Sequence, residues 1–179
     1  MLISGVTREA NKLISTGSLE IDRKMGGGIP FGSLMLVEGG ASSGKSSLVQ
    51  QLLWSALETG ETVSLYVTEQ TVHSLLKQMG SLGLDVVDHF LTDRLRIFPV
   101  SVQSGDTPDL NQFSRHLEVQ FPSGVVVIDS LTTIVPPSSG NQIRDFMSDC
   151  KNLCDNCLLY TSDAADDTPC VDLGGRRII

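Results

Sequence analysis

A lysine and a serine, Lys45 and Ser46, close a glycine-rich stretch with the spacing of a phosphate-binding loop. Residues 39–46 read GGASSGKS, which fits the pattern G-x-x-x-x-G-K-[ST]. In such a loop, backbone N–H groups point at phosphate oxygens, the lysine reaches the outer phosphates and the hydroxyl binds Mg²⁺. We therefore predict a site for ATP and Mg²⁺. Its loop residues are Gly39, Gly40, Ala41, Ser42, Ser43, Gly44, Lys45, Ser46 and Ser47.

An acid at the end of an apolar run supplies the second part of this chemistry. Residues 124–129 read GVVVID, a run typical of a buried strand that ends in the carboxylate of Asp129. A strand-terminal aspartate is often only a turn residue. Downstream of a phosphate-binding loop, however, it favours a carboxylate that holds the magnesium through water. We predict that Asp129 completes the nucleotide site and that Ser46 and Asp129 are the metal residues. Ser130, the next residue, either senses the γ-phosphate or caps the following turn.

Glu69, in the segment YVTEQT, is the candidate catalytic residue. Hydrolysis of ATP needs a group that orients and deprotonates the attacking water, and a carboxylate at the end of a strand can do this. The alternative is a solvated acid near a helix N-terminus, where negative charge is favourable in any case. Both interpretations stay open at this point.

The elements that must position these residues alternate along the chain. Apolar runs predict buried strands over 33–38, 62–68, 95–100 and 124–129, and helical spacing predicts helices over 45–59, 72–81, 109–120 and 142–156. The glycine-rich segment 25–33 and the polar segments 101–108 and 136–141 are predicted loops. Strands that alternate with helices indicate an α/β fold, with a mainly parallel sheet flanked by helices.

Composition and charge narrow the class of protein. The chain has 179 residues, 40% of them hydrophobic and 19% charged, which suits one globular domain. Its net charge is −8 and no segment gathers five Lys or Arg residues, so no nucleic-acid partner is expected. Neither an apolar run of 18 residues nor a secretory leader pattern occurs, and we expect a cytoplasmic protein.

The last residues of the chain differ in character from the rest. Residues 157–179 contain CLLYTSDAAD and CVDLGGRRII, which resemble translated sequencing-library adapters. We therefore expect an ATP-binding domain over 1–156, incomplete at its C-terminus, and a non-native tail over 157–179. Cys157 and Cys170 then belong to the tail. Cys150 and Cys154 lie four apart on a predicted helix, and we expect buried thiols rather than metal ligands.

A longer match points to a family. The run LISTGSLEIDRKMGGGIPFGSLMLVEGGASSGKSS resembles the KaiC-like branch of RecA-type ATPases. Within that branch the chain looks most like the archaellum accessory ATP-binding proteins, on the strength of YVTEQT, LLKQMGSLGLDV, VVVIDSLTTI and NQIRDFMSDCKNLCDN. The resemblance covers about residues 13–156. It implies a RecA-like P-loop NTPase whose C-terminal strands are missing.

The resemblance also implies a function, partners and a location. The protein would be an ATP-binding component of the archaellum motor complex that forms a homo-oligomeric ring, a hexamer, and contacts the motor ATPase and a membrane platform protein. It would be cytoplasmic and peripheral to the membrane through these partners. Related clock proteins carry two adjacent glutamates after the second strand, whereas here Glu69 precedes Gln70. This departure favours weak hydrolysis or a switch that mainly binds ATP.

Proteins with other functions also carry a nucleotide site of this type. A KaiC-like regulatory or signalling ATPase would use the same site, and so would a scaffold that binds ATP without hydrolysing it. A recombinase acting on single-stranded DNA would need basic, glycine-rich loops after the acid-tipped strand. Residues 132–142 read TTIVPPSSGNQ and contain no Lys or Arg, which disfavours that reading.

Overall fold

The computed structural model describes residues 2–5, 12–100, 110–120, 124–134 and 140–162. The loop predicted over 101–108, most of that predicted over 136–141, and the tail from residue 163 onward lie outside this part of the chain. Among the helices of the described ranges, none combines the length and the apolar character needed to cross a membrane.

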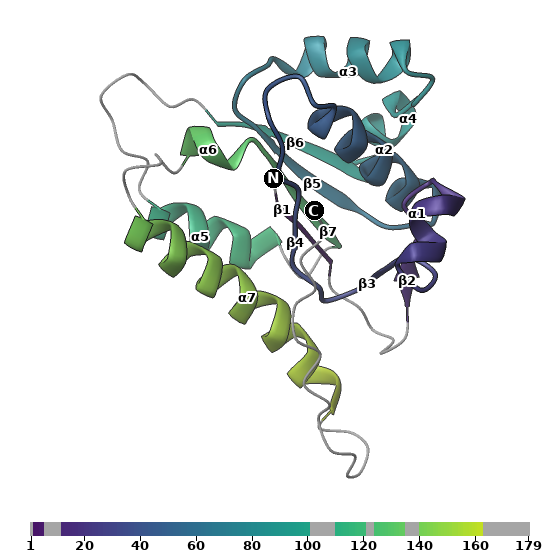
Figure 1. Ribbon diagram of the computed structural model, residues 1–179. Helices are drawn as coiled ribbons and strands as arrows, with labels where there is room; N and C mark the ends of the chain where they lie inside the picture. The colour runs from purple at the N-terminus through teal and green to yellow at the C-terminus, as the bar shows by residue number, and fades with distance from the viewer. Residues whose placement is uncertain (1, 6–11, 101–109, 121–123, 135–139, 163–179) are drawn as a thin grey trace.

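The centre of the molecule is a five-stranded sheet with the order β4-β1-β7-β5-β6 (Figure 1). β5 pairs in parallel with both β6 and β7, and Val67 lies opposite Asp129 in the β5–β7 register. This parallel core confirms the predicted fold class. The strands are β1 (Leu2–Gly5), β4 (Met35–Leu36), β5 (Val63–Val67), β6 (Leu95–Pro99) and β7 (Val125–Asp129).

Two strands of the sheet differ from the prediction. β1 was not predicted, and it runs antiparallel to both of its neighbours, β4 and β7. The strand predicted over 33–38 is reduced to the two residues of β4, and Leu36 is 40% exposed. Because β4 is the last strand at its edge, only one neighbour pairs with it, and the predicted buried strand is wrong in length and burial.

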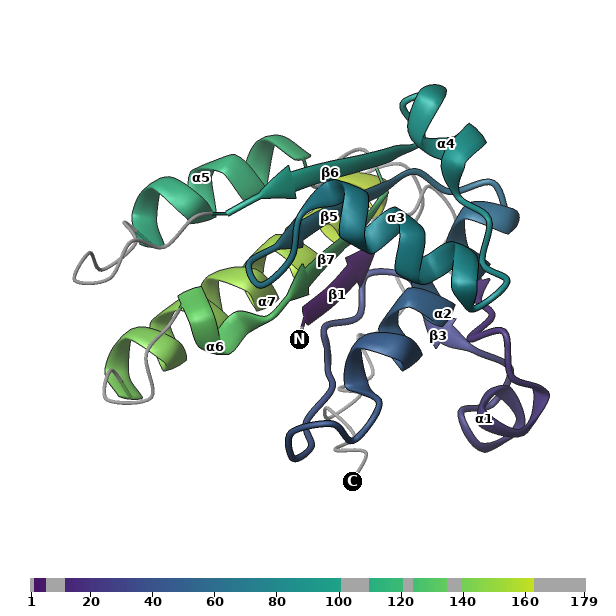
Figure 2. The same cartoon turned by 90° about the horizontal axis from the view of Figure 1, so that it is seen from above.

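Helices cover both faces of the sheet (Figures 1 and 2). One face carries α2 (Lys45–Glu58), α3 (Val72–Ser81) and α4 (Val87–Leu91), and the other carries α5 (Leu110–Gln120), α6 (Leu131–Ile134) and α7 (Gly140–Ser162). The helix predicted over 72–81 has the predicted bounds. α7 continues to Ser162, past the end predicted at Asn156. α4 and α6 are too short to show a helical period in the sequence.

The core consists of two apolar clusters that share β7 between them. Val125 and Val127 pack in the cluster that contains α2 and α3, whereas Val126 and Ile128 pack in the cluster that contains α5, α6 and α7. Successive side chains of a strand point to opposite faces of the sheet. Asp129, two residues after Val127, therefore emerges on the face covered by α2.

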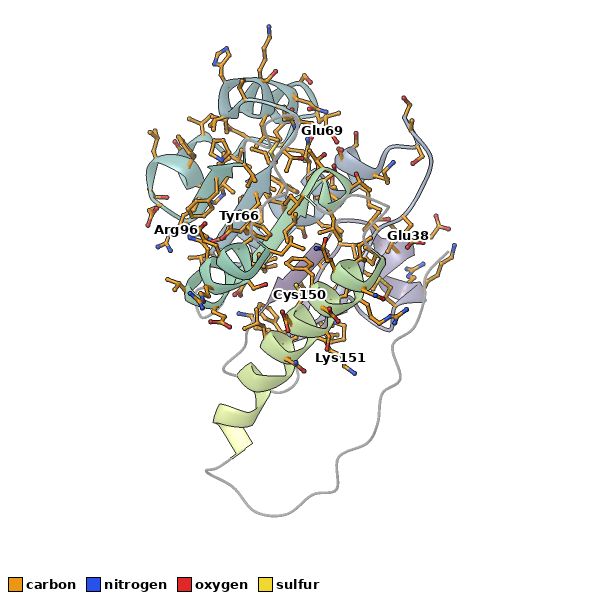
Figure 3. All side chains as sticks on the ribbon, turned by 90° about the vertical axis from the view of Figure 1, so that its left-hand side faces the viewer. Glu38, Tyr66, Glu69, Arg96, Cys150 and Lys151 are labelled. Carbon is orange, nitrogen blue, oxygen red and sulfur yellow. The ribbon has the colours of Figure 1, made fainter. Side chains whose placement is uncertain are left out.

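Aromatic residues fill the second cluster. The Tyr66 ring of β5 stacks on Phe98, with ring centroids 5.0 Å apart, and meets the edge of Phe113 at 5.2 Å. Figure 3 marks Cys150 on α7; its side chain is buried, whereas the neighbouring Lys151 is exposed. The helices on this face thus close a continuous apolar layer over the sheet.

Residues 12–33, which lie between β1 and β4 in the chain, contain a second, two-stranded sheet that packs on the cluster around α2. β2 (Leu13–Ile14) pairs with β3 (Ile29–Pro30), and α1 (Leu19–Lys24) lies between them in the sequence. The loop predicted over 25–33 therefore contains a short strand. The Asp22 carboxylate accepts hydrogen bonds from the Ser15 hydroxyl and the Thr16 N–H. Burial opposes ionisation of Asp22, but these bonds outweigh it and lower its pKa.

Candidate nucleotide site

The predicted phosphate-binding loop joins β4 to α2 and is open to solvent. Gly44 has φ 86°, a left-handed backbone that glycine adopts without strain, and α2 begins immediately after it. The residue before α2 is this glycine, so no side chain at the N-cap position binds the N–H groups of the helix's first turn. The unpaired N–H groups of this turn and the positive end of the helix dipole therefore face outward, as an anion site requires.

A hollow of about 260 Å³ opens at this helix end. Its walls are Ser42, Ser43, Gly44, Lys45, Ser46 and Ser47, all of them residues of the predicted loop. The lining consists of hydroxyls, backbone amides and one ammonium group, which is the donor set that phosphate oxygens require. The residues present therefore fit a bound phosphate chain.

Lys45 lies folded across its own loop. Its Nζ donates hydrogen bonds to the carbonyl oxygens of Gly39, at 3.0 Å, and Gly40, at 2.6 Å. The carbonyl groups of these two glycines therefore point toward the lysine. A phosphate oxygen is a stronger acceptor for an ammonium group than a neutral carbonyl. The lysine is placed to exchange these bonds for phosphate oxygens. Ala41 lies exposed at the tip of the loop.

The two predicted metal residues lie next to each other although they are 83 residues apart in the chain. The Ser46 hydroxyl donates to Oδ1 of Asp129 at a distance of 3.5 Å. The reason is geometric: Ser46 lies in the first turn of α2, and Asp129 emerges from the end of β7 on the face that α2 covers. A hydroxyl and a carboxylate so placed are hard oxygen ligands, the type that Mg²⁺ prefers.

Electrostatics at Asp129 reflect this crowded position. Burial raises the pKa of the Asp129 carboxyl, and the nearby Glu69 carboxylate acts in the same direction. The hydrogen bond from Ser46 and the charge of Lys45 act in the opposite direction without cancelling the rise. A divalent cation between these groups would offset the repulsion between the two acids.

Glu69 lies at the same end of the sheet, beyond β5 (Figure 3). Its Oε1 accepts hydrogen bonds from the Ser130 hydroxyl at 2.7 Å and from the Thr133 hydroxyl at 3.2 Å. Thr68 ties the two strand ends together, because its N–H donates to the Asp129 carbonyl and its hydroxyl accepts from the Ser130 N–H. Thr68 and Thr133 were not predicted. Their signal in the sequence is weak, a hydroxyl residue directly after β5 and another four residues after the end of β7.

Cys150 and Cys154 on α7 are both buried, as predicted from the sequence. Burial raises the pKa of the Cys150 thiol to about 12, and the neighbouring Cys154 adds to the rise. Within the described ranges no group of three or more His, Cys, Asp or Glu side chains could hold a metal ion. The Ser46–Asp129 pair would therefore need phosphate oxygens and water to complete a magnesium shell.

Comparison with known proteins shows two groups of relatives. The archaeal flagellar ATP-binding protein FlaH of Sulfolobus acidocaldarius is 29% identical over 150 residues, which cover 79% of this chain and 64% of that protein. The circadian clock oscillator protein KaiC of Thermosynechococcus vestitus is 29% identical over 140 residues, or 78% of this chain and 27% of KaiC. The chain therefore spans less than two thirds of either relative.

A solved structure also shows similarity to FlaH. The flagellar accessory protein FlaH of Methanocaldococcus jannaschii superposes with a TM-score of 0.63 at 25% sequence identity, covering 81% of this chain and 67% of that one. The fold is thus the RecA-like fold of that protein. A family model described as "ATPase: KaiC" matches residues 14–161, which is more than half of the sequence. This chain belongs to the KaiC family of ATPases.

Proposed function

We propose that this chain is the nucleotide-binding part of an archaellum ATP-binding protein and that it binds ATP with Mg²⁺. The observation that carries the proposal is the contact between Ser46 and Asp129, which joins the loop to the acid at the end of β7. The hollow beside this pair supports it, since its donors suit a triphosphate. The similarity to FlaH supports the cellular role.

Each residue has a role in this proposal. The amides of residues 42–47 bind the phosphate oxygens, and Lys45 exchanges its bonds to Gly39 and Gly40 for the outer phosphates. Ser46 and Asp129 hold the metal, Ser46 directly and Asp129 through water. Bound magnesium supplies positive charge that neutralises the phosphates.

Hydrolysis in this proposal is slow and switch-like. Glu69 is the base, and it lies close enough to Asp129 for its charge to affect that carboxyl. The next residue is Gln70, so one carboxylate alone serves this position. Slow turnover suits a protein whose bound nucleotide sets its contacts with other components of a motor.

The partners are part of the same proposal. We expect the intact protein to form a homo-oligomeric ring, most simply a hexamer, and to contact the archaellum motor ATPase and the membrane platform protein from the cytoplasmic side. Size-exclusion chromatography with light scattering, with and without Mg²⁺–ATP, would measure the assembly.

Nucleotide affinity tests the proposal directly. Titration of a fluorescent ATP analogue in the presence of Mg²⁺ should saturate for the wild-type chain. The Lys45→Ala variant should bind at least roughly tenfold more weakly, because a charge-assisted hydrogen bond to phosphate contributes more than about 1.4 kcal/mol. Lys77→Ala is the matched control, since Lys77 is an exposed lysine of α3. Equal affinity in wild type and Lys45→Ala would refute the site.

A further inference from the structure

We propose that Ser130 and Thr133 are positioning residues that fix Glu69, so that its second carboxylate oxygen faces the water that attacks ATP. The inference deepens the proposed function and rests on it. It concerns a cluster of hydroxyls between the end of β7 and α6, which the roles assigned above do not use. In this proposal the Ser130 hydroxyl holds a carboxylate, a role that differs from both roles expected from the sequence, which were sensing the γ-phosphate and capping the following turn.

The two hydroxyls hold the same oxygen of Glu69. Ser130 donates to Oε1 at 2.7 Å and Thr133 donates to Oε1 at 3.2 Å, while Oε2 has no hydrogen bond to any part of the described chain. Glu69 is an exposed residue. An exposed glutamate otherwise samples several rotamers, so two bonds to one oxygen restrict the side chain and leave the other oxygen available.

The hydroxyls are themselves anchored. The Ser130 N–H donates to the Thr68 hydroxyl at 3.0 Å, which ties Ser130 to the end of β5. The Ser130 and Thr133 hydroxyls lie 3.0 Å apart. Ile134, which follows Thr133 in α6, is fully buried in the second core cluster. Groups supported in this way can define the geometry of a reacting side chain to a fraction of an ångström.

The hydroxyl cluster also lies at the end of the sheet that carries the candidate nucleotide site. Val67 and Asp129 are opposite each other in the β5–β7 register, so Glu69 and Ser130 leave neighbouring strands at the same end. Asp129 contacts Ser46 there, on the side of the phosphate hollow. Glu69 therefore lies at the same end of the sheet as the hollow, and in this proposal its Oε2 atom borders the region that the outer phosphate would occupy.

The chemical step needs no further reactant. The water oxygen bonds to the γ-phosphorus as the bond from that phosphorus to the β–γ bridging oxygen breaks, and ADP leaves with the electron pair. The proton of the water passes to Oε2 of Glu69 and then to solvent. Ser130 and Thr133 keep their protons and act only through the orientation of Glu69.

Steady-state kinetics on the full chain test this inference. Ser130→Ala and Thr133→Ala should each lower kcat about tenfold, as expected for one lost hydrogen bond to a charged group. KM and the affinity for the ATP analogue should stay within roughly twofold of wild type, because neither hydroxyl binds the nucleotide. Thr133→Ser should restore kcat, since it returns the hydroxyl in a smaller side chain.

Thr132 offers a matched control on the same helix. Its hydroxyl contacts Ser130 at 3.1 Å, and no hydrogen bond joins it to Glu69. Thr132→Ala should leave kcat within twofold of wild type. An equal loss in Thr132→Ala, or unchanged kcat in both Ser130→Ala and Thr133→Ala, would overturn the positioning role. So would a wild-type rate no higher than that of Glu69→Gln, although ATP binding would then stand. Loss of the proposed function itself would appear separately, as a failure of the wild-type chain to bind the analogue.

Discussion

Replacing Gly124 by alanine should destabilise the fold by about 2–6 kcal/mol, a large part of the stability of a single domain. Gly124 immediately precedes β7, the strand that carries Asp129 to the nucleotide site. Its backbone has φ 141°, a conformation that side chains rarely adopt. An added Cβ would lie 2.5 Å from the Thr62 hydroxyl oxygen and closer still to the Thr62 carbonyl oxygen.

The estimate combines two costs. Backbone strain at such an angle costs on the order of 1–3 kcal/mol, and forced displacement in a packed site costs roughly as much again. The neighbour has little freedom to move, because the Thr62 carbonyl accepts the hydrogen bond from the Val125 N–H at 2.8 Å. Relief of the clash would therefore weaken the start of the β5–β7 pairing.

Gly80→Ala is a control of opposite sign. Gly80 is an exposed residue of α3, and an added Cβ would meet nothing within 4 Å. Alanine in a helix is more favourable than glycine by up to about 0.5–1 kcal/mol, and Gly80 lies in the last turn of α3, so this variant should be slightly more stable than wild type. Urea unfolding followed by circular dichroism measures both variants. Equal stability of Gly124→Ala and wild type would refute the packing assigned to β7.

Two further predictions concern titratable groups. The pKa of the Asp129 carboxyl is raised above its ordinary value of 3.8, so this group takes up a proton at a higher pH than an ordinary aspartate. Because the proton competes with Mg²⁺ for the carboxylate, the Mg²⁺-dependent affinity for ATP should fall as the pH falls through the pKa of Asp129. Isothermal titration calorimetry at several pH values measures this affinity. The Asp129→Asn variant should lose the pH dependence, and a wild-type affinity that rises toward acid pH would contradict the prediction. The Cys150 thiol, with a pKa raised to about 12 from 9.0, should resist alkylation by iodoacetamide at pH 8 until urea unfolds the chain. The same pKa shift affects the free energy of unfolding. Because the Cys150 thiol holds its proton more tightly in the folded state than in the unfolded state, the free energy of unfolding should decline as the pH rises from about 9 toward 12. Mass spectrometry showing rapid labelling of the native protein at Cys150 would count against the packing of α7.

The parts of the fold that carry strong periodic patterns could be predicted from sequence. The run 124–129 has a valine or isoleucine at four successive positions, and β7 has its predicted end at Asp129. β1, with four residues, and α6, also with four, are too short to produce a recognisable period. β1 also depends on pairing with β4 and β7, which lie far along the chain.

In the candidate site, too, some features could be predicted from the sequence and others could not. The candidate phosphate-binding loop is a contiguous motif, so its residues could be predicted one by one. The hydrogen bond between Glu69 and Ser130 depends on the register between β5 and β7, which no local pattern specifies. The role of Thr133 depends in addition on the direction in which α6 leaves β7. The sequence therefore suffices to predict the loop and both acids as candidate site residues, but not the hydrogen bonds that Glu69 accepts.

The central claim is that Ser46 and Asp129 share one magnesium ion at the outer phosphates of ATP. A crystal structure of the chain with Mg²⁺ and a non-hydrolysable ATP analogue tests it most directly. We expect the metal at about 2.1 Å from the Ser46 hydroxyl, with Asp129 one water molecule away and Lys45 on the outer phosphates. A nucleotide bound away from this loop, or a metal out of reach of Asp129 even through water, would contradict the account.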